Sequence, residues 1–200
     1  MMNIIQVVGG PGSGKSTLAR QLLADWPGMA GLMRVDRYLR NRQPDDGADF
    51  LLLPTSVDWP LVMAHLDLLA AGGTVTMPEY DWANGKRMSP THPPKPEQTI
   101  RASEWLIIEG LYFIPVLSLP SVRLFVDAPA GVRRERSEAR ETNLSQNLGP
   151  AYDQVADPLY TEYILPQRKL ADHVLDGTLE RKRLADQARR YWASQWTGWG

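Results

Sequence analysis

The 200-residue chain contains no cysteine, and this absence excludes several kinds of site. Disulfide bonds, thiolate nucleophiles and zinc–thiolate centres all require cysteine, and a chain without it is compatible with a reducing cytoplasm. The chain also lacks an excess of charge of either sign, with a formal net charge of −1 and a pI near 6.3. No basic field therefore invites nucleic acid or an anionic membrane.

Long apolar runs are missing too, and the start of the chain has no charged segment followed by an apolar one. The sequence therefore predicts neither a membrane span nor a secretory signal, and we expect a cytoplasmic protein. Hydrophobic residues make up 43% of the chain, which is enough to bury the core of one domain over residues 1–200.

A glycine-rich stretch, Gly9-Gly10-Pro11-Gly12-Ser13-Gly14-Lys15-Ser16, follows the apolar run over residues 4–8. It fits G-x-x-x-x-G-K-[ST], the phosphate-binding loop, in the required context of a strand before it and a helical pattern after it. Glycines let successive N–H groups point into one concavity, and the helix N-terminus adds its positive dipole end. Lys15 would reach the terminal phosphates, and the Ser16 hydroxyl would bind Mg²⁺. The predicted nucleotide-binding residues are Gly9, Gly10, Pro11, Gly12, Ser13, Gly14, Lys15, Ser16 and Thr17.

Two carboxylates follow predicted strands. Residues 30–35 can form a short strand that leads to Asp36, and the apolar run over residues 105–110 contains Glu109 at its end. Because ligands collect at the carboxyl ends of strands in open α/β sheets, both side chains are expected beside the phosphate loop. A buried Glu109 needs a partner, and Mg²⁺ would supply one. Asp36 would accept a proton from a substrate hydroxyl or hold a metal-bound water, or it caps a helix or forms a salt bridge in the loop with Arg37 or Arg40.

Four arginines, Arg133, Arg134, Arg136 and Arg140, fall at helical spacing after Pro129. The first, third and fourth share one helix face. Either glutamates along the same helix pair with the arginines in solvent, or the arginines form a lid that clamps the transferring phosphoryl group.

Asp58 opens a predicted helix as its N-cap, with Pro60 near the first helical position. Residues 74–82 have strand character, and Asn84-Gly85 predicts a hairpin. The aromatic and acidic side chains near this turn either cover a planar or sugar-like ligand or pack on the core. His65, in the middle of the helix, is assigned no role.

Strands and helices alternate along the whole chain, which favours one α/β domain with a mainly parallel sheet. The last strand is expected over residues 171–176 and a charged amphipathic helix over residues 179–199. Trp192, Trp196 and Trp199 on that helix are expected to pack internally or to contact another subunit.

Taken in order, several stretches resemble the uridine kinase and phosphoribulokinase family of P-loop kinases. They are Val35-Asp36-Arg37-Tyr38, Val57-Asp58-Trp59-Pro60, Pro78-Glu79-Tyr80-Asp81-Trp82, Ile107-Ile108-Glu109-Gly110, Phe125-Val126-Asp127 and residues 163–172. The resemblance implies a three-layer α/β/α fold around a five-stranded, mainly parallel sheet. It also implies a β-hairpin over the acceptor site, at about residues 74–100, and an arginine lid at about residues 130–150.

Roles for individual residues follow from the same resemblance. It implies that Asp36 is the catalytic base and that Ser16 and Glu109 hold Mg²⁺. The residues that would stabilise the moving phosphoryl group are Lys15, Arg133, Arg136 and Arg140. Those that would contact the acceptor are Asp36, Tyr38, Asp58, Tyr80 and Trp82. The expected activity is transfer of the γ-phosphate of ATP to a hydroxyl of a small metabolite, with uridine or cytidine as the first candidates.

The acceptor is the part that the sequence leaves open. Uridine kinases carry a hairpin histidine that contacts the pyrimidine, and here the aligned position is Gly85 or a neighbour. Nicotinamide riboside, pantothenate, glycerate or a sugar are alternative acceptors for the same fold. A nucleotide-binding regulatory ATPase is an alternative of another class. Because family kinases often form oligomers, a homo-oligomer is a further expectation.

Overall fold

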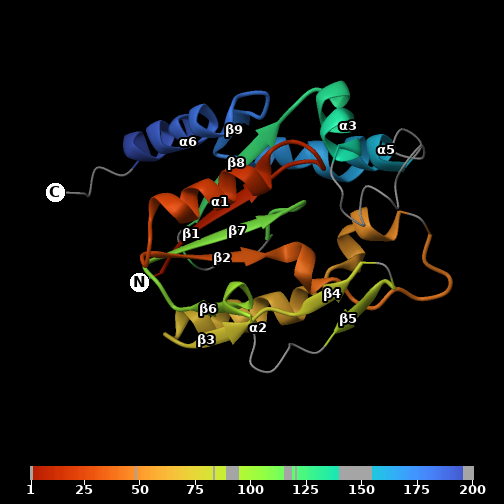
Figure 1. The fold of residues 1–200 in the computed structure, drawn as a ribbon, viewed down its shortest axis with the longest axis horizontal. Coiled ribbons are helices and arrows are strands. Elements are labelled where there is room, and N and C mark those ends of the chain that lie inside the picture. Colours follow the sequence, from red (N-terminus) through yellow and green to blue (C-terminus); the bar gives the residue numbers. More distant parts are fainter. Residues whose placement is uncertain are drawn as a thin grey trace.

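The computed structural model describes residues 2–47, 49–82, 84–88, 95–114, 119, 121–139 and 155–195. Its centre is a sheet of five parallel strands in the order β2–β7–β1–β8–β9 (Figure 1). The strands are β1 (Asn3–Val8), β2 (Ala30–Arg34), β7 (Trp105–Gly110), β8 (Ser121–Asp127) and β9 (His173–Asp176). The three middle strands are apolar runs, as expected for strands buried on both faces, and the predicted parallel sheet is confirmed.

Helices cover both faces of this sheet (Figure 1). They are α1 (Lys15–Asp25) and α6 (Arg181–Gln195) on one face and α2 (Trp59–Ala70) on the other. Along β1, Ile4 packs in the cluster with α2, whereas Ile5 and Val7 pack in the cluster with α1 and α6. Successive strand residues point to opposite faces, so one strand contributes to two cores. The predicted three-layer α/β/α arrangement is confirmed.

Two small antiparallel sheets accompany the main one. One pairs β3 (Thr74–Thr76) with β6 (Thr99–Arg101), and the other is a hairpin of β4 (Glu79–Asp81) and β5 (Lys86–Met88). The predicted hairpin is confirmed, and Gly85 in its turn has a φ of +63°. The single strand expected over residues 74–82 is divided near Pro78, because proline has no N–H to donate to a ladder.

Helical segments complete the chain. They are α3 (Ala130–Glu138), α5 (Asp157–Leu159), a π-helical turn (Tyr160–Ile164) and a 3₁₀ segment (Leu165–Leu170). The short 3₁₀ turns are η1 (Val35–Tyr38), η2 (Phe50–Leu52), η3 (Pro54–Ser56) and η4 (Pro96–Gln98). No helix in the described ranges is both long and apolar enough to cross a bilayer.

Helix α6 accounts for the described part of the helix expected over residues 179–199. Its Trp192 is buried and lies edge-on to Trp26 and Trp105, with ring centroids 5.1 and 4.3 Å apart. Internal packing is therefore confirmed for Trp192. Trp196 and Trp199 lie outside the described residues.

Two leucines of α2 provide a matched test of this packing. Leu66 is 1% exposed in the core, whereas Leu68 is 53% exposed. We expect Leu66→Ala to lower the free energy of unfolding by about 2–5 kcal/mol, because the removed side chain leaves a cavity. Leu68→Ala should change it by no more than about 0.5 kcal/mol. Urea unfolding followed by circular dichroism measures both, and equal losses would contradict the assigned orientation of α2.

Candidate active site

The loop after β1 lies between the carboxyl ends of two neighbouring strands. β1 pairs in parallel with β7 and with β8, so the chain leaves β1 at the rim where all three strands end. Gly12 and Gly14 have φ of +76° and +104°, a conformation that side chains disfavour. A Cβ at Gly12 would also collide with the backbone carbonyl of Arg133 in α3. The loop therefore offers bare backbone, as a phosphate cradle requires.

Polar groups in this cradle are buried. Lys15 is 8% exposed, and its Nζ donates to the carbonyl oxygen of Gly10 at 3.3 Å. The Ser13 hydroxyl and Nη1 of Arg133 are buried and have no hydrogen-bond partner among the described residues. Because phosphate oxygens would satisfy such donors, these residues fit a nucleotide polyphosphate. All predicted nucleotide-binding positions, residues 9–17, lie in this loop and in the first turn of α1.

Glu109 lies near the end of β7, beside the loop. It is 4% exposed, and Ser16 Oγ donates to its Oε1 at 2.5 Å. The structure thus brings together the two residues predicted to hold Mg²⁺. Mg²⁺ is usually held by one or two carboxylates together with phosphate oxygens and water, so this pair fits such an ion.

Asp36 lies in η1, directly after β2. Its Oδ2 accepts a hydrogen bond from Nη2 of Arg34 at 2.9 Å, whereas its buried Oδ1 has no partner among the described residues. Burial raises the pKa of the Asp36 carboxyl and the charge of Glu109 adds to the rise, while Arg34 opposes it. An unpaired carboxylate oxygen with a raised pKa is suited to accept a proton.

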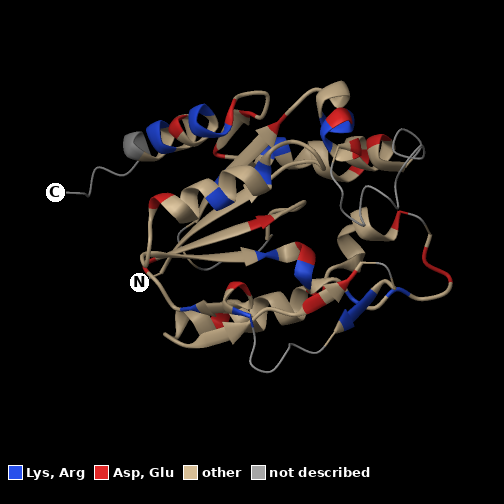
Figure 2. Cartoon of the chain, in the orientation of Figure 1, with Lys and Arg blue, Asp and Glu red and all other residues tan. Residues whose placement is uncertain are grey.

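Arg34 joins Asp36 to the residues predicted to hold Mg²⁺. Its Nε is 3.5 Å from Oε2 of Glu109, so Ser16, Glu109, Arg34 and Asp36 form a continuous series of polar contacts. Figure 2 shows basic and acidic segments together where β2 and β7 end. The sequence interpretation missed Arg34, although a charged residue at the carboxyl end of a predicted parallel strand, where ligands collect, is a signal that could have found it.

Helix α3 lies against the phosphate loop and carries the predicted arginine lid. Nη1 of Arg136 donates to the carbonyl oxygens of Gly177 and Gly12 at 2.6 and 3.5 Å. Arg134, on another side of the helix, pairs with an exposed glutamate one turn later. The structure therefore contains an exposed arginine–glutamate ion pair, at Arg134, and an arginine directed toward the phosphate loop, at Arg136. Arg140 lies outside the described residues.

Arg133 is held more firmly than its neighbours on α3. Its side chain is 4% exposed, Nη2 pairs with Asp157 at 3.0 Å, and Nε donates to the carbonyl oxygen of Ala128 at 3.1 Å. The guanidinium carbon lies 3.6 Å from the ring centroid of Tyr160. Asp157 and Tyr160 come from a segment that the sequence did not connect with the lid, because no local pattern links them to it.

Tyr38, predicted to contact the acceptor, lies in η1 two residues after Asp36. Its side chain is fully buried, and its hydroxyl lies 2.9 Å from Nδ1 of His65 in α2. Burial raises the pKa of Tyr38 and lowers that of His65, so both side chains are neutral near pH 7. The Tyr38 side chain is therefore part of the core beside η1, and its contact with an acceptor stays a prediction.

Asp58 is the N-cap of α2, as predicted, because its Oδ1 accepts the N–H of Leu61 at 3.1 Å. Its Oδ2 pairs with Arg87 of β5 at 2.9 Å. Desolvation acts to raise the pKa of Asp58, but the hydrogen bonds from Arg87 and Leu61 outweigh it, and the pKa is lowered. Arg87 also donates to the carbonyl oxygens of Tyr38 and Leu39. This arginine therefore fastens the hairpin to η1.

Tyr80 and Trp82, on and beside β4, lie edge-on with ring centroids 5.0 Å apart. Tyr80 is 4% exposed, packs with Leu39 and Phe50, and donates its hydroxyl to the carbonyl oxygen of Arg40 at 3.3 Å. Of the two interpretations of these aromatics, packing is the one that the structure gives for Tyr80.

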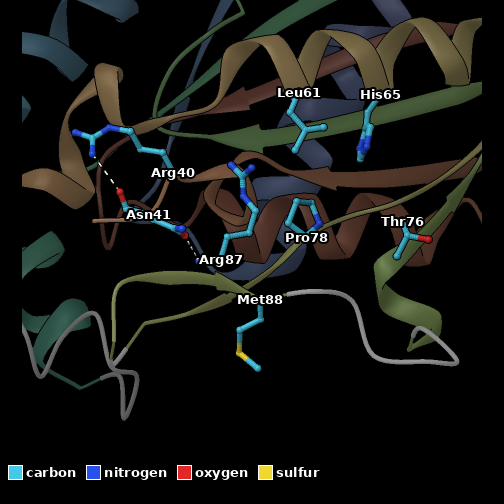
Figure 3. A pocket seen from close by; sticks show the side chains of 8 residues that line it. All are labelled: Arg40, Asn41, Leu61, His65, Thr76, Pro78, Arg87 and Met88. Atoms are coloured by element: carbon cyan, nitrogen blue, oxygen red, sulfur yellow. Dashed lines mark hydrogen bonds between the residues drawn. The ribbon is translucent and has the colours of Figure 1, made fainter. Parts of the chain in front are cut away.

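A cavity of about 460 Å³ lies between α2 and the hairpin (Figure 3). Its lining comes from α2, from the loop after η1 and from the hairpin region: Arg40, Asn41, Leu61, His65, Thr76, Pro78, Arg87 and Met88. The backbone N–H of Arg87 donates to Oδ1 of Asn41 at 2.7 Å (Figure 3). No acidic side chain is among these lining residues. His65, which the sequence left without a role, faces this space.

Curated relatives of this chain include uridine kinases. The one from Deinococcus deserti is 28% identical over 187 residues, which cover 86% of each chain. The one from Chloroflexus aurantiacus is 30% identical over 190 residues, which cover 87% of this chain and 86% of the relative.

Two solved structures share the fold of this chain. A structure described as a possible uridine kinase, from Bacillus stearothermophilus, gives a TM-score of 0.57 at 20% identity, over 88% of this chain and 89% of that one. A proposed fructose transport system kinase from Silicibacter sp. TM1040 gives 0.60 at 22% identity, over 86% and 89%. At these identities the likeness shows a shared fold.

The model of the Phosphoribulokinase / Uridine kinase family matches residues 4–182, from β1 to the first residues of α6. The matched range includes the phosphate loop, both carboxylates at the strand ends and α3. The chain therefore belongs to the Phosphoribulokinase / Uridine kinase family, whose members are ATP-dependent kinases.

Proposed function

We propose that the protein transfers the γ-phosphoryl group of ATP to a metabolite hydroxyl at the rim where β1, β2 and β7 end. Family membership establishes a kinase of small metabolites. The observation that carries the assignment of the site is the series of contacts from Ser16 through Glu109 and Arg34 to Asp36. It joins the nucleotide loop to an unpaired carboxylate oxygen, and phosphoryl transfer depends on such proximity.

In the proposed reaction, the acceptor oxygen forms a bond to the γ-phosphorus while the bond from that phosphorus to the β–γ bridging oxygen breaks. ADP leaves with the electron pair of the broken bond, and the hydroxyl proton passes to Oδ1 of Asp36. The loop backbone and Lys15 hold the phosphates, and Ser16 with Glu109 would hold Mg²⁺. Bound there, Mg²⁺ would supply positive charge against the phosphate oxygens.

The lid arginines add positive charge from the α3 side. A Cβ at Gly10 would lie 3.3 Å from Nη1 of Arg133, so the unpaired end of this guanidinium reaches the phosphate loop. Arg133 would stabilise the charge of the moving group, and Arg136 would keep α3 against the loop. Arg140 is proposed for the same lid on the basis of its spacing.

A nucleoside such as uridine or cytidine is the first candidate acceptor. The support is that relatives at 28% and 30% identity are uridine kinases. We place the acceptor in the cavity between α2 and the hairpin. One wall of this cavity is connected to the proposed catalytic base, Asp36. Tyr38 lies in the same 3₁₀ turn as Asp36, and its hydroxyl contacts His65, which lines the cavity.

A second candidate, a hydroxyl metabolite with a carboxylate or phosphate group, is favoured by the donors in this cavity. Oδ1 of Asn41 already accepts from Arg87, which leaves the Asn41 amide nitrogen as a donor. If the Tyr38 hydroxyl donates to Nδ1 of neutral His65, the Nε2–H of His65 is also a donor. The two guanidinium groups of the lining are each paired with a carboxylate outside it, Arg87 with Asp58 and Arg40 with Asp46, so the Asn41 and His65 donors carry this candidate.

The test is ADP release from Mg-ATP with acceptors matched except for charge. The pairs are glycerol and glycerate, pantothenol and pantothenate, and ribose and ribose 5-phosphate, beside uridine, cytidine and nicotinamide riboside. Lys15→Ala serves as the blank. Stimulation by uridine or cytidine supports the first candidate, and selective stimulation by the charged member of a pair supports the second. ATP turnover that ignores every compound would contradict transfer to these metabolites and would favour a regulatory ATPase.

Removal of the proposed base gives the first prediction for the site. We expect Asp36→Asn to lower kcat by about 10²–10⁴-fold, because an amide cannot accept the hydroxyl proton. Binding of Mg-ATP, measured by calorimetry, should stay near that of the wild type. Asp67→Asn, on the exposed side of α2, is the matched control. Wild-type kcat in Asp36→Asn would refute the assignment of the base.

The lid gives the second prediction. Arg133→Ala should lower kcat by about 10³-fold or more, since the charge that stabilises the transferring group is lost. Arg134→Ala removes a neighbouring arginine whose ion pair is exposed, and it should leave kcat near the wild-type value. Steady-state kinetics measure both variants, and thermal unfolding shows whether the buried Asp157 contact also affects stability. Similar kcat in the two variants would rule out the lid role of Arg133.

A further inference from the structure

We propose that Arg34 is a positioning residue for phosphoryl transfer, which holds the Asp36 carboxylate in place and ties it to Glu109. This inference rests on the proposed function, in which Asp36 is the base. Arg34 is the last residue of β2, and the sheet register places it beside Glu109 of β7. From this position at the rim, one side chain reaches both carboxylates.

The two contacts of Arg34 use different nitrogen atoms. Nη2 lies 2.9 Å from Oδ2 of Asp36, and Nε lies 3.5 Å from Oε2 of Glu109. A planar guanidinium presents these donors in a fixed fork, which the single ammonium of lysine cannot reproduce. With Oδ2 held in this way, the Asp36 carboxylate is restrained, and its buried Oδ1, which has no partner among the described residues, is the oxygen proposed to accept the proton.

The charges of Asp36 and Glu109 explain why an arginine side chain lies between them. Carboxylates at neighbouring strand ends repel each other, and a guanidinium between them offsets the repulsion. The side chains of Arg34 and Asp36 are 32% and 33% exposed, so solvent screens their pair and its contribution to stability is small. The contribution of Arg34 is therefore geometric, since it fixes the base relative to the residue proposed for the metal.

A double-mutant cycle tests this inference. The variants are Arg34→Met, Asp36→Asn and the double variant. Each is assayed for phosphoryl transfer to the most active acceptor of the panel and for Mg-ATP hydrolysis without an acceptor. We expect Arg34→Met to lower kcat by about 10–100-fold, as for other residues that orient a functional group. The KM values for ATP and acceptor should stay near those of the wild type. In the Asp36→Asn background, Arg34→Met should cause almost no additional loss, because both changes act through one group.

Two further measurements separate positioning from folding. Affinity for Mg-ADP by calorimetry and the midpoint of thermal unfolding should be nearly unchanged in Arg34→Met. Arg123→Met, which removes a strand arginine with a long ion pair to Asp172, is the matched control and should keep wild-type kcat. If Arg34→Met does not fold, the same cycle is run with Arg34→Gln and Arg34→Lys.

The outcomes distinguish the inference from the proposed function. Wild-type kcat in Arg34→Met beside a disabled Asp36→Asn would overturn the inference alone. Additive losses in the double variant would also overturn it, since Arg34 would then act independently of Asp36. Wild-type kcat in Asp36→Asn would overturn the proposed base, and the role of Arg34 with it.

Discussion

Residue 12 has to be a glycine, because the backbone carbonyl of Arg133 occupies the place that a Cβ would take. This contact sets how closely α3 approaches the phosphate loop. With the helix at that distance, Nη1 of Arg133 reaches the loop while the rest of its guanidinium is held by Asp157 and Tyr160. The glycine at position 12 and the buried Arg133 are thus parts of one arrangement, because a side chain at position 12 would keep α3 and its arginine away from the loop.

Most of the fold could be predicted because its signals are local. The apolar runs of β1, β7 and β8 mark buried strands, and the glycine loop marks the point where β1 gives way to α1. Parallel pairing then brings Asp36 and Glu109 to the same rim, so their proximity to the loop follows from the strand ends alone. The strand expected over residues 74–82 is the exception. Pro78 divides it into β3 and β4, and the prediction of a single strand did not take this proline into account.

The partners of the site residues could not be predicted, since they depend on contacts between distant segments. Arg87 reaches Asp58 across 29 positions, and Tyr38 meets His65 across 27. No periodicity or motif encodes either pair. Arg34 was missed for another reason, because a charge in a short strand is normally assigned to solvent. The sequence therefore predicts which groups carry chemistry, while the structure shows which neighbours hold them.

The hairpin has a consequence for how such an enzyme changes during evolution. β4 and β5 pair with each other and with no strand of the central sheet in the described part of the chain. They are joined to η1 mainly through side-chain and carbonyl contacts of Arg87. Substitutions in the hairpin can therefore reshape the cavity wall while the phosphate loop and the parallel core keep their packing. With the acceptor in this cavity, as proposed, selection can act on the acceptor site and on the nucleotide site almost separately, which suits one scaffold to a succession of metabolites.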